Sequence, residues 1–466
     1  YIFLIKMELK DKFWIKIILI LFILTKLISH YFYKLVWWDA AVYIGMGKYI
    51  YSLGNSGLWE SSRPIIWPII LGFLWKIGLN AVFFGRIIEI ILGAMCILLT
   101  YLIGKKIFSQ RTALFGSLFL AISPTFFFFN GVMLTEIAST FFSLAAIYFL
   151  IEKKHFASGI LFGIAFMTRY LQLLVFIAAI SSYLLYFGRK NIKILKKIII
   201  GFVAAILPFL TLNQVLYGNA LSPFLNQLYL SENSGWPNYH PTNYYFIHLF
   251  KENLFYLLFI FGMFLAFRAK DKDKNLISIS FLLPFLFFNL INQKEMRFLI
   301  MLMPYMLLLI SFLLFHIQAI FKNKFYDYAL IALILISILM ALHSIPIYYK
   351  SEPVQTNPYE ELQNNLNNLK LGNKIWISSP IISVSSDSKI DRLMYYSVFS
   401  VEISKELIKD SKNADFIFMD SCDLACKPND ISCENSKDEF ISYLKKELKQ
   451  IFSKKIDGCE QYVFKK

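Results

Sequence analysis

Long runs of apolar residues recur along this chain from Phe13 to Ile345. Most runs have about 17–25 residues, the length that a helix needs to cross a bilayer core of about 30 Å. Charged residues make up only 17% of the 466 residues, whereas a soluble domain carries about a quarter. The chain is therefore predicted to be an α-helical polytopic membrane protein.

We expect eleven spanning helices. Their ranges are 13–35, 82–104, 112–130, 133–151, 156–168, 171–187, 197–216, 253–267, 276–291, 298–316 and 326–345. Arg169 and Gln172 interrupt the apolar stretch between the fifth and sixth ranges. The first run is followed by Trp37, Trp38 and Asp39 rather than by a small-residue cleavage site, which favours a retained helix over a signal peptide. Residues 64–79 are apolar but short and contain proline and glycine, so they are expected to form an interfacial or re-entrant segment.

The positions of the basic residues predict how the chain is oriented across the membrane. The chain has 47 basic and 31 acidic residues. From Pro346 onward there are 17 basic and 18 acidic residues, so the excess of basic residues belongs to the membrane part. This excess does not indicate a nucleic-acid partner. The basic clusters at 105–111, 189–197, 268–274 and 322–324 all fall on one side if the N-terminus is inside. We expect a multi-pass plasma-membrane protein with a cytoplasmic N-terminus and an extracytoplasmic C-terminus.

Two domains are predicted. Residues 1–345 form the transmembrane domain, with one outer loop over 36–80 that holds interfacial helices and a second over 217–247. Residues 346–466 form a small extracytoplasmic α/β domain.

The second domain shows the patterns of strands and of a helix. Segments 374–378, 414–420 and 462–464 are typical of short strands. Apolar residues then recur at helical spacing, namely Phe440, Leu444, Leu448 and Phe452.

Four of the five cysteines lie in the C-terminal domain, at Cys422, Cys426, Cys433 and Cys459. An even number of cysteines in a non-cytoplasmic domain favours disulfides, for which three pairings are possible. A zinc site is the alternative, and the spacing of the cysteines fits it less well.

Charged residues gather at the predicted outer ends of the spans. They are Asp39, Arg63, Glu136, Arg169, Glu295 and Arg297. Arginine donates in pairs to phosphate oxygens, and a carboxylate can accept a proton from an attacking hydroxyl, so a phosphate-bearing lipid substrate would suit this set.

Each of these residues also has a simpler interpretation. Asp39 could cap a helix that begins near Ala40. The arginines could be interfacial anchors, Glu136 could cap or pair locally, and Glu295 could be a local partner of Lys294 or Arg297. His240 is a lone histidine in the second outer loop, and such a histidine more often has a structural role than binds a ligand.

Five segments carry a resemblance to a known family. The runs WWDAAVYIGMGKYIYSLG (37–54) and SSRPIIWPIILGFL (61–74) resemble the first outer loop of the GT-C membrane glycosyltransferases, which include protein O-mannosyltransferases and aminoarabinose transferases. LTEIAST (134–140), GIAFMTRYLQLLVF (163–176) and EMRFLIMLMPY (295–305) resemble later motifs of the same superfamily, in order. The cysteine-bearing tail is similar to that of prokaryotic and especially archaeal members.

The resemblance implies an inverting transfer of one sugar from a polyprenyl (dolichyl) phosphate-linked donor to a protein, lipid or glycan acceptor at the outer membrane face. Asp39 would be the general base, and Glu136 would orient the acceptor or assist the base. Arg63, Arg169, Arg297 and Glu295 would form the donor-phosphate site. Many relatives have a second acidic residue directly after the first. Here that position is Ala40, which argues against a metal held by adjacent carboxylates. No cofactor is expected to be required, and a divalent cation stays open without support from the sequence.

Two other functions remain open, a transporter or flippase of lipid-linked sugars and a non-catalytic membrane scaffold. Transporters commonly place charged residues at the membrane midplane within repeated halves. Here the charged residues are predicted to lie at one face and the sequence shows no repeat, which favours an enzyme.

Overall fold

The structure is a computed structural model. It describes residues 11–33, 35–187, 192–232, 239–321, 324–351, 359–367, 374–394, 399–426, 429–456 and 458–466. Several residues used for the topology prediction lie outside the described residues. They are Arg189, Lys190, Lys322 and residues 233–238 of the second outer loop. Contacts between residues divide the chain into two compact units. The first comprises 1–34, 86–211 and 239–353, and the second comprises 35–85, 212–238 and 354–466.

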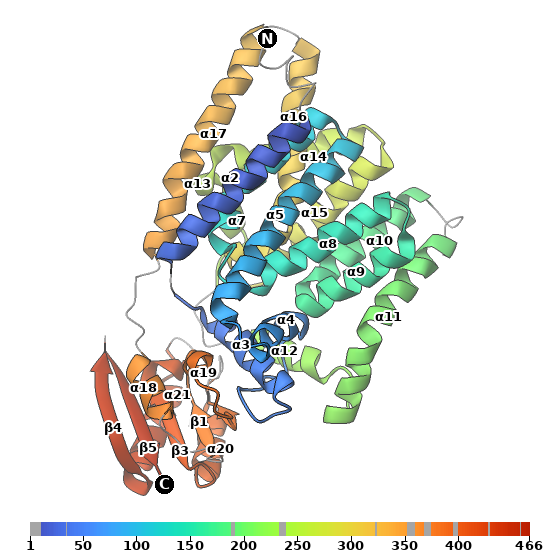
Figure 1. The fold of residues 1–466 in the computed structure, drawn as a ribbon. Helices are drawn as coiled ribbons and strands as arrows, with labels where there is room; N and C mark the ends of the chain where they lie inside the picture. The colour runs from blue at the N-terminus through green and yellow to red at the C-terminus, as the bar shows by residue number, and fades with distance from the viewer. Residues whose placement is uncertain are drawn as a thin grey trace. The chain divides into compact units, whose positions relative to one another are not determined.

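The first unit is helical (Figure 1). All or most of each of the following helices belongs to it: α2 (Asp11–Phe32), α5 (Ala81–Ile107), α6 (Gln110–Ile122), α7 (Pro124–Phe129), α8 (Thr135–Ile151), α9 (His155–Thr168), α10 (Leu173–Phe187), α11 (Ile192–Tyr217), α13 (Tyr244–Glu252), α14 (Phe259–Arg268), α15 (Lys272–Leu290), α16 (Met303–Phe321) and α17 (Lys324–Ser351). Short 3₁₀ helices connect them at η2 (Tyr170–Gln172), η4 (Leu254–Leu258) and η5 (Met296–Met301).

Each of the eleven predicted spans coincides with one helix or with two consecutive helices. Among the described residues, six helices are long and apolar enough to cross a membrane: Phe13–Phe32, Ala81–Ile107, Ile192–Tyr217, Lys272–Leu290, Met303–Ile320 and Phe325–Tyr349. The helical membrane fold is confirmed, whereas the number of spans and their orientation stay predictions.

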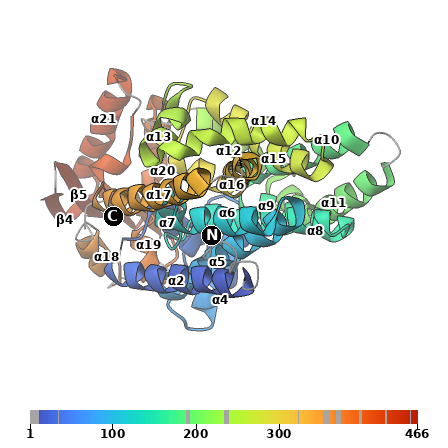
Figure 2. The same ribbon diagram turned by 90° about the horizontal axis from the view of Figure 1, so that it is seen from above.

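Helix α16 forms the centre of the first unit. It contacts α6, α14, α15 and α17 (Figure 2). Its residues 303–311 are all buried. Gly104 of α5 and Gly116 of α6 both face Leu308 of α16, where an added Cβ would lie less than 3 Å from the leucine side chain. Small residues at such positions let helices approach closely.

The outer faces of the first unit are apolar. On α2, α11 and α17, Ile28 is 61% exposed, Ile200 58% and Leu339 65%. Extended exposed apolar surface is unusual on soluble proteins. The lipid of a membrane would cover these side chains.

Polar and proline residues interrupt the predicted spans. Ser123 caps α7, whose first residue is Pro124, so the range 112–130 consists of two helices. The backbone of Arg169 is extended between α9 and η2, which confirms the interruption predicted there.

The second unit combines the first outer loop with the C-terminal segment. Its elements are α3 (Trp38–Tyr51), α4 (Ile66–Lys76), α12 (Ser222–Glu232), α18 (Glu360–Asn367), β1 (Ile375–Ile377), α19 (Ile382–Ser385), β2 (Arg392–Leu393), α20 (Val401–Ser411), β3 (Phe416–Asp420), η6 (Ser421–Asp423), α21 (Ile431–Glu447), β4 (Lys449–Ile456) and β5 (Cys459–Lys465). At 11 residues, α4 is short for a span, and its interfacial position stays a prediction.

The five strands form one sheet in the order β2-β1-β3-β5-β4. Strands β2, β1 and β3 are parallel, and β5 pairs antiparallel with β3 and β4. The predicted strands at 374–378, 414–420 and 462–464 are confirmed as β1, β3 and β5. The helical prediction is confirmed for Phe440 and Leu444 but is wrong for Phe452, which lies in β4, because α21 ends at Glu447.

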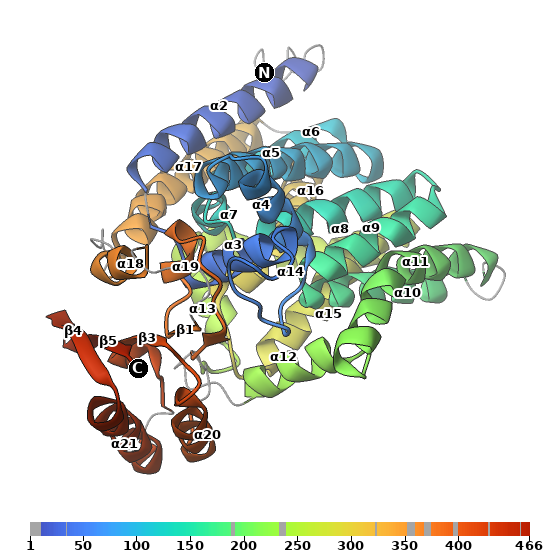
Figure 3. The ribbon, with the colours of Figure 1, turned by 60° about the horizontal axis from the view of Figure 1, so that its bottom comes forward.

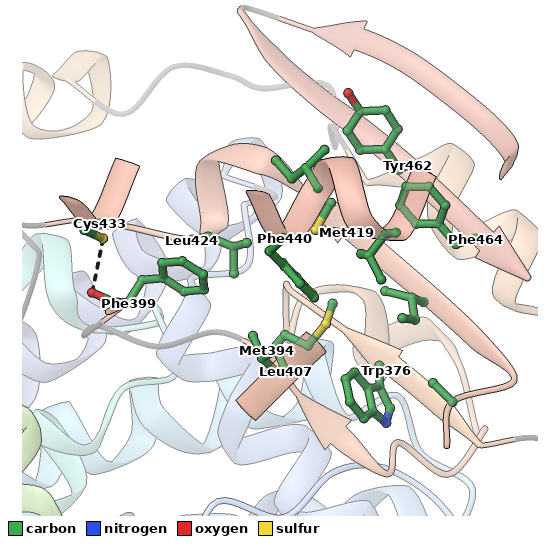
Figure 4. Packing of buried hydrophobic residues seen from close by; sticks show 14 residues of the cluster. Trp376, Met394, Phe399, Leu407, Met419, Leu424, Cys433, Phe440, Tyr462 and Phe464 are labelled. Atoms are coloured by element: carbon green, nitrogen blue, oxygen red, sulfur yellow. Dashed lines mark hydrogen bonds between the residues drawn. The ribbon is translucent and has the colours of Figure 1, made fainter. Parts of the chain in front are cut away.

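Alternate residues of the central strands supply two separate cores, as the two-residue period of a strand requires. Ile417 and Met419 of β3 pack on one face in a core that also contains side chains of α20 and α21. Figure 4 shows Met419 in this core with Leu407 of α20 and Phe440 of α21. Phe416 and Phe418 pack on the other face. This second core also contains side chains from α18, from α3 and from the loop that follows α3, namely Leu362, Leu366, Val42, Met46 and Leu58.

The predicted domain division differs from this arrangement in two respects. Helix α17 continues through Pro346 to Ser351, so the predicted boundary at residue 345 lies inside a helix. Residues 35–85 group with the C-terminal segment rather than with the helices that precede and follow them in sequence.

Both disulfides lie in the C-terminal domain. Cys422 pairs with Cys459, and Cys426 pairs with Cys433. The prediction of disulfides is thus confirmed, and one of the three possible pairings is selected. The zinc alternative is wrong for these cysteines, because each sulfur is bonded to another.

A buried carboxyl group lies beside the second core. The Tyr359 hydroxyl donates to Oδ1 of Asp423 at 2.9 Å, and the Ser378 hydroxyl donates to Oδ2. Burial raises the pKa of Asp423 to about 7, and the nearby Asp420 carboxylate adds to the rise. The folded domain therefore holds a proton on Asp423 to a higher pH than an exposed aspartate would.

Candidate active site

Asp39 lies in the first turn of α3. The helix begins at Trp38 and its N-cap is Trp37. The alternative in which Asp39 caps the helix is therefore wrong, since the cap lies two residues earlier. An acidic side chain in the first turn is favoured by the exposed N–H groups and the positive end of the helix dipole.

Arg63 binds Asp39. Its Nη2 lies 2.9 Å from Oδ1 of Asp39, and its Nε lies 3.1 Å from Oε1 of Glu60. The guanidinium carbon also lies 5.8 Å from the centre of the Tyr43 ring. Because Arg63 bridges two carboxylates, it fixes the position of the Asp39 side chain.

Glu136 occupies the equivalent place in the first turn of α8. The loop before α8 contains two residues with positive φ, Gly131 at 94° and Met133 at 64°. The backbone N–H groups of both residues donate to Oε2 of Glu89, at 2.8 Å and 2.6 Å. A buried carboxylate on α5 thus holds the turn that places Glu136.

Two arginines converge on Glu136, which is only 3% exposed. Nη1 of Arg169 lies 2.8 Å from Oε1 of Glu136, and Nε of Arg297 lies 3.5 Å from the same atom. Arg169 also donates to the hydroxyl of Thr135 at 3.1 Å. The break between α9 and η2 and the start of η5 therefore bring two guanidinium groups to the N-terminus of α8.

Glu295 pairs with Arg297 through both of its carboxylate oxygens. The Tyr245 hydroxyl donates to the backbone carbonyl of Glu295 at 3.3 Å. Lys294 donates to the backbone carbonyl of His240 at 2.9 Å. Glu295 is thus the local partner of Arg297, and a role in donor binding stays a prediction.

Several buried atoms at this cluster lack hydrogen-bond partners among the described residues. They include Nε of Arg169 and Oε2 of Glu136. Buried polar atoms are nearly always satisfied in proteins, so such atoms call for an explanation. An acceptor oxygen from a bound ligand would complete the hydrogen bonding of Arg169.

The structure thus groups the predicted site residues in two sets. Glu136, Arg169, Arg297 and Glu295 form one cluster in the first unit. Asp39 and Arg63 form an ion pair in the second unit.

Two charged residues were missed from the sequence. Glu60 lies three positions before Arg63, the spacing at which oppositely charged residues meet within a helical turn. Glu89 lies inside an apolar run predicted to span the membrane, where any ionisable residue is a functional candidate.

Among the described residues, three side chains of metal-ligand type come together at Asp420, Cys422 and Cys459. Cys422 and Cys459 form a disulfide and so are not thiolate ligands. The prediction about cofactors concerns Asp39 and Ala40 and stays a prediction.

Comparison with known proteins identifies the fold. The family model described as dolichyl-phosphate-mannose-protein mannosyltransferase matches residues 62–213. The chain is similar to the crystal structure of ArnT from Cupriavidus metallidurans bound to undecaprenyl phosphate, with a TM-score of 0.66 and 11% identity over 96% of this chain and 97% of that chain. It is also similar to the archaeal oligosaccharyltransferase AglB from Archaeoglobus fulgidus in complex with an inhibitory peptide and a dolichol-phosphate, with a TM-score of 0.61 and 12% identity over 97% of this chain and 74% of that chain.

No sequence among the curated proteins matches the chain. At 11% and 12% identity, the structural similarity establishes the fold. The family match begins at residue 62, so it covers the last part of the first outer loop and the helices that follow it. The chain therefore shares the fold of these two membrane proteins, and residues 62–213 match the mannosyltransferase family model.

Proposed function

We propose that this protein transfers one sugar, with inversion, from a polyprenyl-phosphate-linked donor to an acceptor at the outer face of the membrane. The matching family is described by a dolichyl-phosphate-mannose donor. The structures of ArnT and AglB, which share the fold, contain undecaprenyl phosphate and a dolichol-phosphate, respectively. These similarities support a lipid phosphate as the carrier and leave the sugar and the acceptor open.

The observation that carries the proposal is the pair of guanidinium groups at Glu136. Arg169 and Arg297 are held together by one carboxylate, and the buried Nε of Arg169 has no hydrogen-bond acceptor among the described residues. A guanidinium presents N–H groups in a fork that matches two phosphate oxygens. We assign the donor phosphate to this cluster, where the charge that develops on the leaving phosphate would be stabilised.

Asp39 is the proposed general base. The acceptor's hydroxyl oxygen attacks the anomeric carbon while its proton passes to the Asp39 carboxylate. The bond between the anomeric carbon and the phosphate oxygen breaks, and the electron pair leaves with the polyprenyl phosphate. A single displacement of this kind inverts the anomeric centre. The ion pair with Arg63 holds the carboxylate in one orientation.

The test compares purified wild-type protein with Asp39→Asn in lipid. Asp273→Asn is the control, because Asp273 also lies in the first turn of a helix, α15. Radiolabelled polyprenyl-phosphate sugars are supplied with a membrane extract as acceptor, and donor consumption and label transfer are followed. Loss of a general base typically costs about 10²–10⁴-fold in rate, so Asp39→Asn should lose nearly all turnover and Asp273→Asn should keep it.

Two results would contradict the proposal. Donor binding without consumption in both wild type and Asp39→Asn would point to a transporter or to a scaffold. Equal turnover in wild type and a folded Asp39→Asn variant would show that another group accepts the proton.

A further inference from the structure

Lys48 of α3 is a buried lysine with every N–H donor in use. Its side chain is 3% exposed. Its Nζ donates to the backbone carbonyls of Ser383, Val384 and Ser386 at 3.1 Å, 2.9 Å and 2.8 Å, and it lies 3.0 Å from Oδ1 of Asp387. An ammonium group has three donors, so Lys48 binds the carbonyls at the end of α19 as a cap would.

The same stretch of the C-terminal domain binds the rest of the first outer loop. Gly57 donates its N–H to the carbonyl of Ser388 at 3.1 Å and accepts the N–H of Ile390 at 2.8 Å. Nε1 of Trp75, at the end of α4, donates to Asp387 at 3.0 Å. Figure 3 shows α19 beside α3, and the contacts between these two helices agree.

Close packing fixes α3 on two sides. A Cβ added at Gly45 would lie 2.7 Å from Leu58 and 2.9 Å from the Ser383 hydroxyl. A Cβ added at Gly47 would lie 2.6 Å from the backbone N of Gly72 in α4. Neither position of α3 can therefore accept a larger residue without moving its neighbour.

Asp39 and Lys48 are parts of one rigid element. They lie on the same 14-residue helix, about 13 Å apart along its axis at about 1.5 Å per residue. A tilt of α3 at Lys48 therefore moves the carboxylate of Asp39. The side chains of Val42 and Met46, between them in sequence, belong to the second core of the C-terminal domain.

We propose that the C-terminal domain is the platform that positions α3, and that Lys48 is the positioning residue that connects this platform to Asp39. The proposal rests on the function proposed above and adds a role for residues 354–466. Lys48 touches no reacting atom. Its contribution is the orientation of the general base.

Lys48→Met in the full-length protein removes the four contacts of the ammonium group while keeping the length of the side chain. Lys389→Met is the matched control, because Lys389 lies in the same stretch with a side chain that is 51% exposed. Hydrogen exchange of the α3 peptide reports the position and order of the helix without any need for activity. Donor turnover in lipid gives kcat and KM for the polyprenyl-phosphate sugar.

We expect faster exchange across α3 in Lys48→Met than in wild type or Lys389→Met. A displacement of about 1 Å can cost about 10²-fold in rate, so kcat should fall by about 10–100-fold. KM for the donor should change by less than about threefold, because the phosphate is assigned to Arg169 and Arg297. Asp387→Ala, which leaves the three backbone carbonyls in place, should show smaller changes in the same directions and serves if Lys48→Met does not fold.

Three results would overturn the inference. Unchanged exchange of α3 in Lys48→Met would show that the lysine does not hold the helix. Faster exchange with an unchanged kcat would show a purely structural contact. Changes in kcat and KM by the same factor as in Lys389→Met would show a nonspecific effect. If wild type consumes no donor, the proposed function fails, and the exchange experiment alone still decides whether Lys48 holds α3.

Discussion

At the scale of single residues, both candidate carboxylates are built in the same way. Asp39 and Glu136 are each the second residue of a helix, and each is paired with arginine supplied from another element. The helix N-terminus and the arginine both favour negative charge at that place. Glu136 is nearly fully buried, and removing one member of a buried ion pair leaves the other uncompensated. These side chains are therefore expected to tolerate little change.

Arg169→Lys tests the assignment of the phosphate. Lysine keeps the charge, but its compact ammonium cannot contact Glu136 and also present a planar fork to a ligand. We expect KM for the donor to rise by about 10–100-fold and kcat to fall as well, because the fork both binds the phosphate and stabilises the charge that develops on it in the transition state. Arg392→Lys is the control, since Arg392 pairs with Glu406 and Asp410 in the C-terminal domain. An unchanged KM in Arg169→Lys would remove the phosphate from this cluster.

Asp423 should make the stability of the C-terminal domain depend on pH. Its pKa in the folded domain is about 7 because the carboxyl is buried, whereas that of an unfolded aspartate is about 4. Between these pH values the folded state binds more protons than the unfolded state at Asp423. The contribution of Asp423 to the free energy of unfolding is therefore largest at low pH and falls as pH rises. The slope approaches about 1.4 kcal/mol per pH unit and levels off above about pH 7.

The Asp423→Asn variant should lose this part of the pH dependence. An amide can still accept from Tyr359 or Ser378, and it does not ionise. Hydrogen exchange of the β1 and β3 amides, corrected for the pH dependence of intrinsic exchange, measures the effect between pH 5 and 8. The same slope in wild type and variant would mean that another group is responsible.

At the scale of elements, the turn between α7 and α8 depends on α5. Met133 has a positive φ without being glycine, which is uncommon. The Glu89 carboxylate accepts the N–H groups on both sides of Val132, and Asn130 donates to the Glu89 backbone carbonyl at 2.8 Å. The strained turn persists because these bonds hold it.

Glu89→Ala should displace Glu136, whereas Glu89→Gln should not. Alanine leaves two buried N–H groups without their acceptor, at about 1–3 kcal/mol each, whereas a glutamine oxygen can still accept both. We expect kcat to fall by about 10–100-fold in the alanine variant and by a few-fold at most in the glutamine variant. Exchange of residues 130–140 should rise in parallel. Equal losses in both variants would show that the charge of Glu89, rather than its acceptor oxygen, matters.

The sequence predicts these elements better than it predicts their contacts. Apolar periodicity and length locate the helices, and the alternation of apolar residues locates β1, β3 and β5, because both signals are local. Phe452 continued the helical spacing of Phe440 and Leu444, but it lies in β4 because α21 ends at Glu447. The partners of Lys48 lie more than 300 residues away, and no local pattern indicates such a contact.

In the candidate site, too, the sequence predicts the residues better than it predicts their contacts. Its charged residues could be found from sequence because ionisable groups at the ends of apolar runs are rare. Which arginine binds which carboxylate could not be found, since Arg169 and Arg297 reach Glu136 from separate elements. Glu60 and Glu295 are both glutamates that lie close in sequence to an arginine of the site. The sequence analysis named Glu295 and missed Glu60, because the residue type alone does not show which carboxylate binds an arginine.

At the scale of the whole molecule, the C-terminal domain is not an independent appendage. One of its two cores is completed by Val42, Met46 and Leu58 of the first outer loop. Deleting residues 350–466 would therefore expose apolar side chains of α3, and a loss of transfer would not distinguish acceptor binding from displacement of Asp39. Point variants that leave both cores intact are the better test of what this domain does.

The two disulfides should contribute unequally to this assembly. The Cys422–Cys459 bond joins residues 37 positions apart, whereas the Cys426–Cys433 bond joins residues 7 positions apart. In the chain-entropy model, loops of these lengths correspond to about 4 and about 2.5 kcal/mol of stabilisation. We expect Cys422→Ala with Cys459→Ala to speed exchange of β3 and β5 more than Cys426→Ala with Cys433→Ala does.

The longer disulfide should also influence α3. It links η6, directly after β3, to the start of β5, and both strands contribute to the core that α3 completes. Loss of this bond should therefore speed exchange of α3 and lower kcat, whereas loss of the shorter bond should leave α3 nearly unchanged, because Cys433 packs in the opposite core. Hydrogen exchange of the two paired variants, with kcat measured on the same samples, makes the comparison. Faster exchange of β5 without any change in α3 would mean that the two faces of the sheet unfold separately, and the C-terminal domain would then not act on Asp39 through its fold.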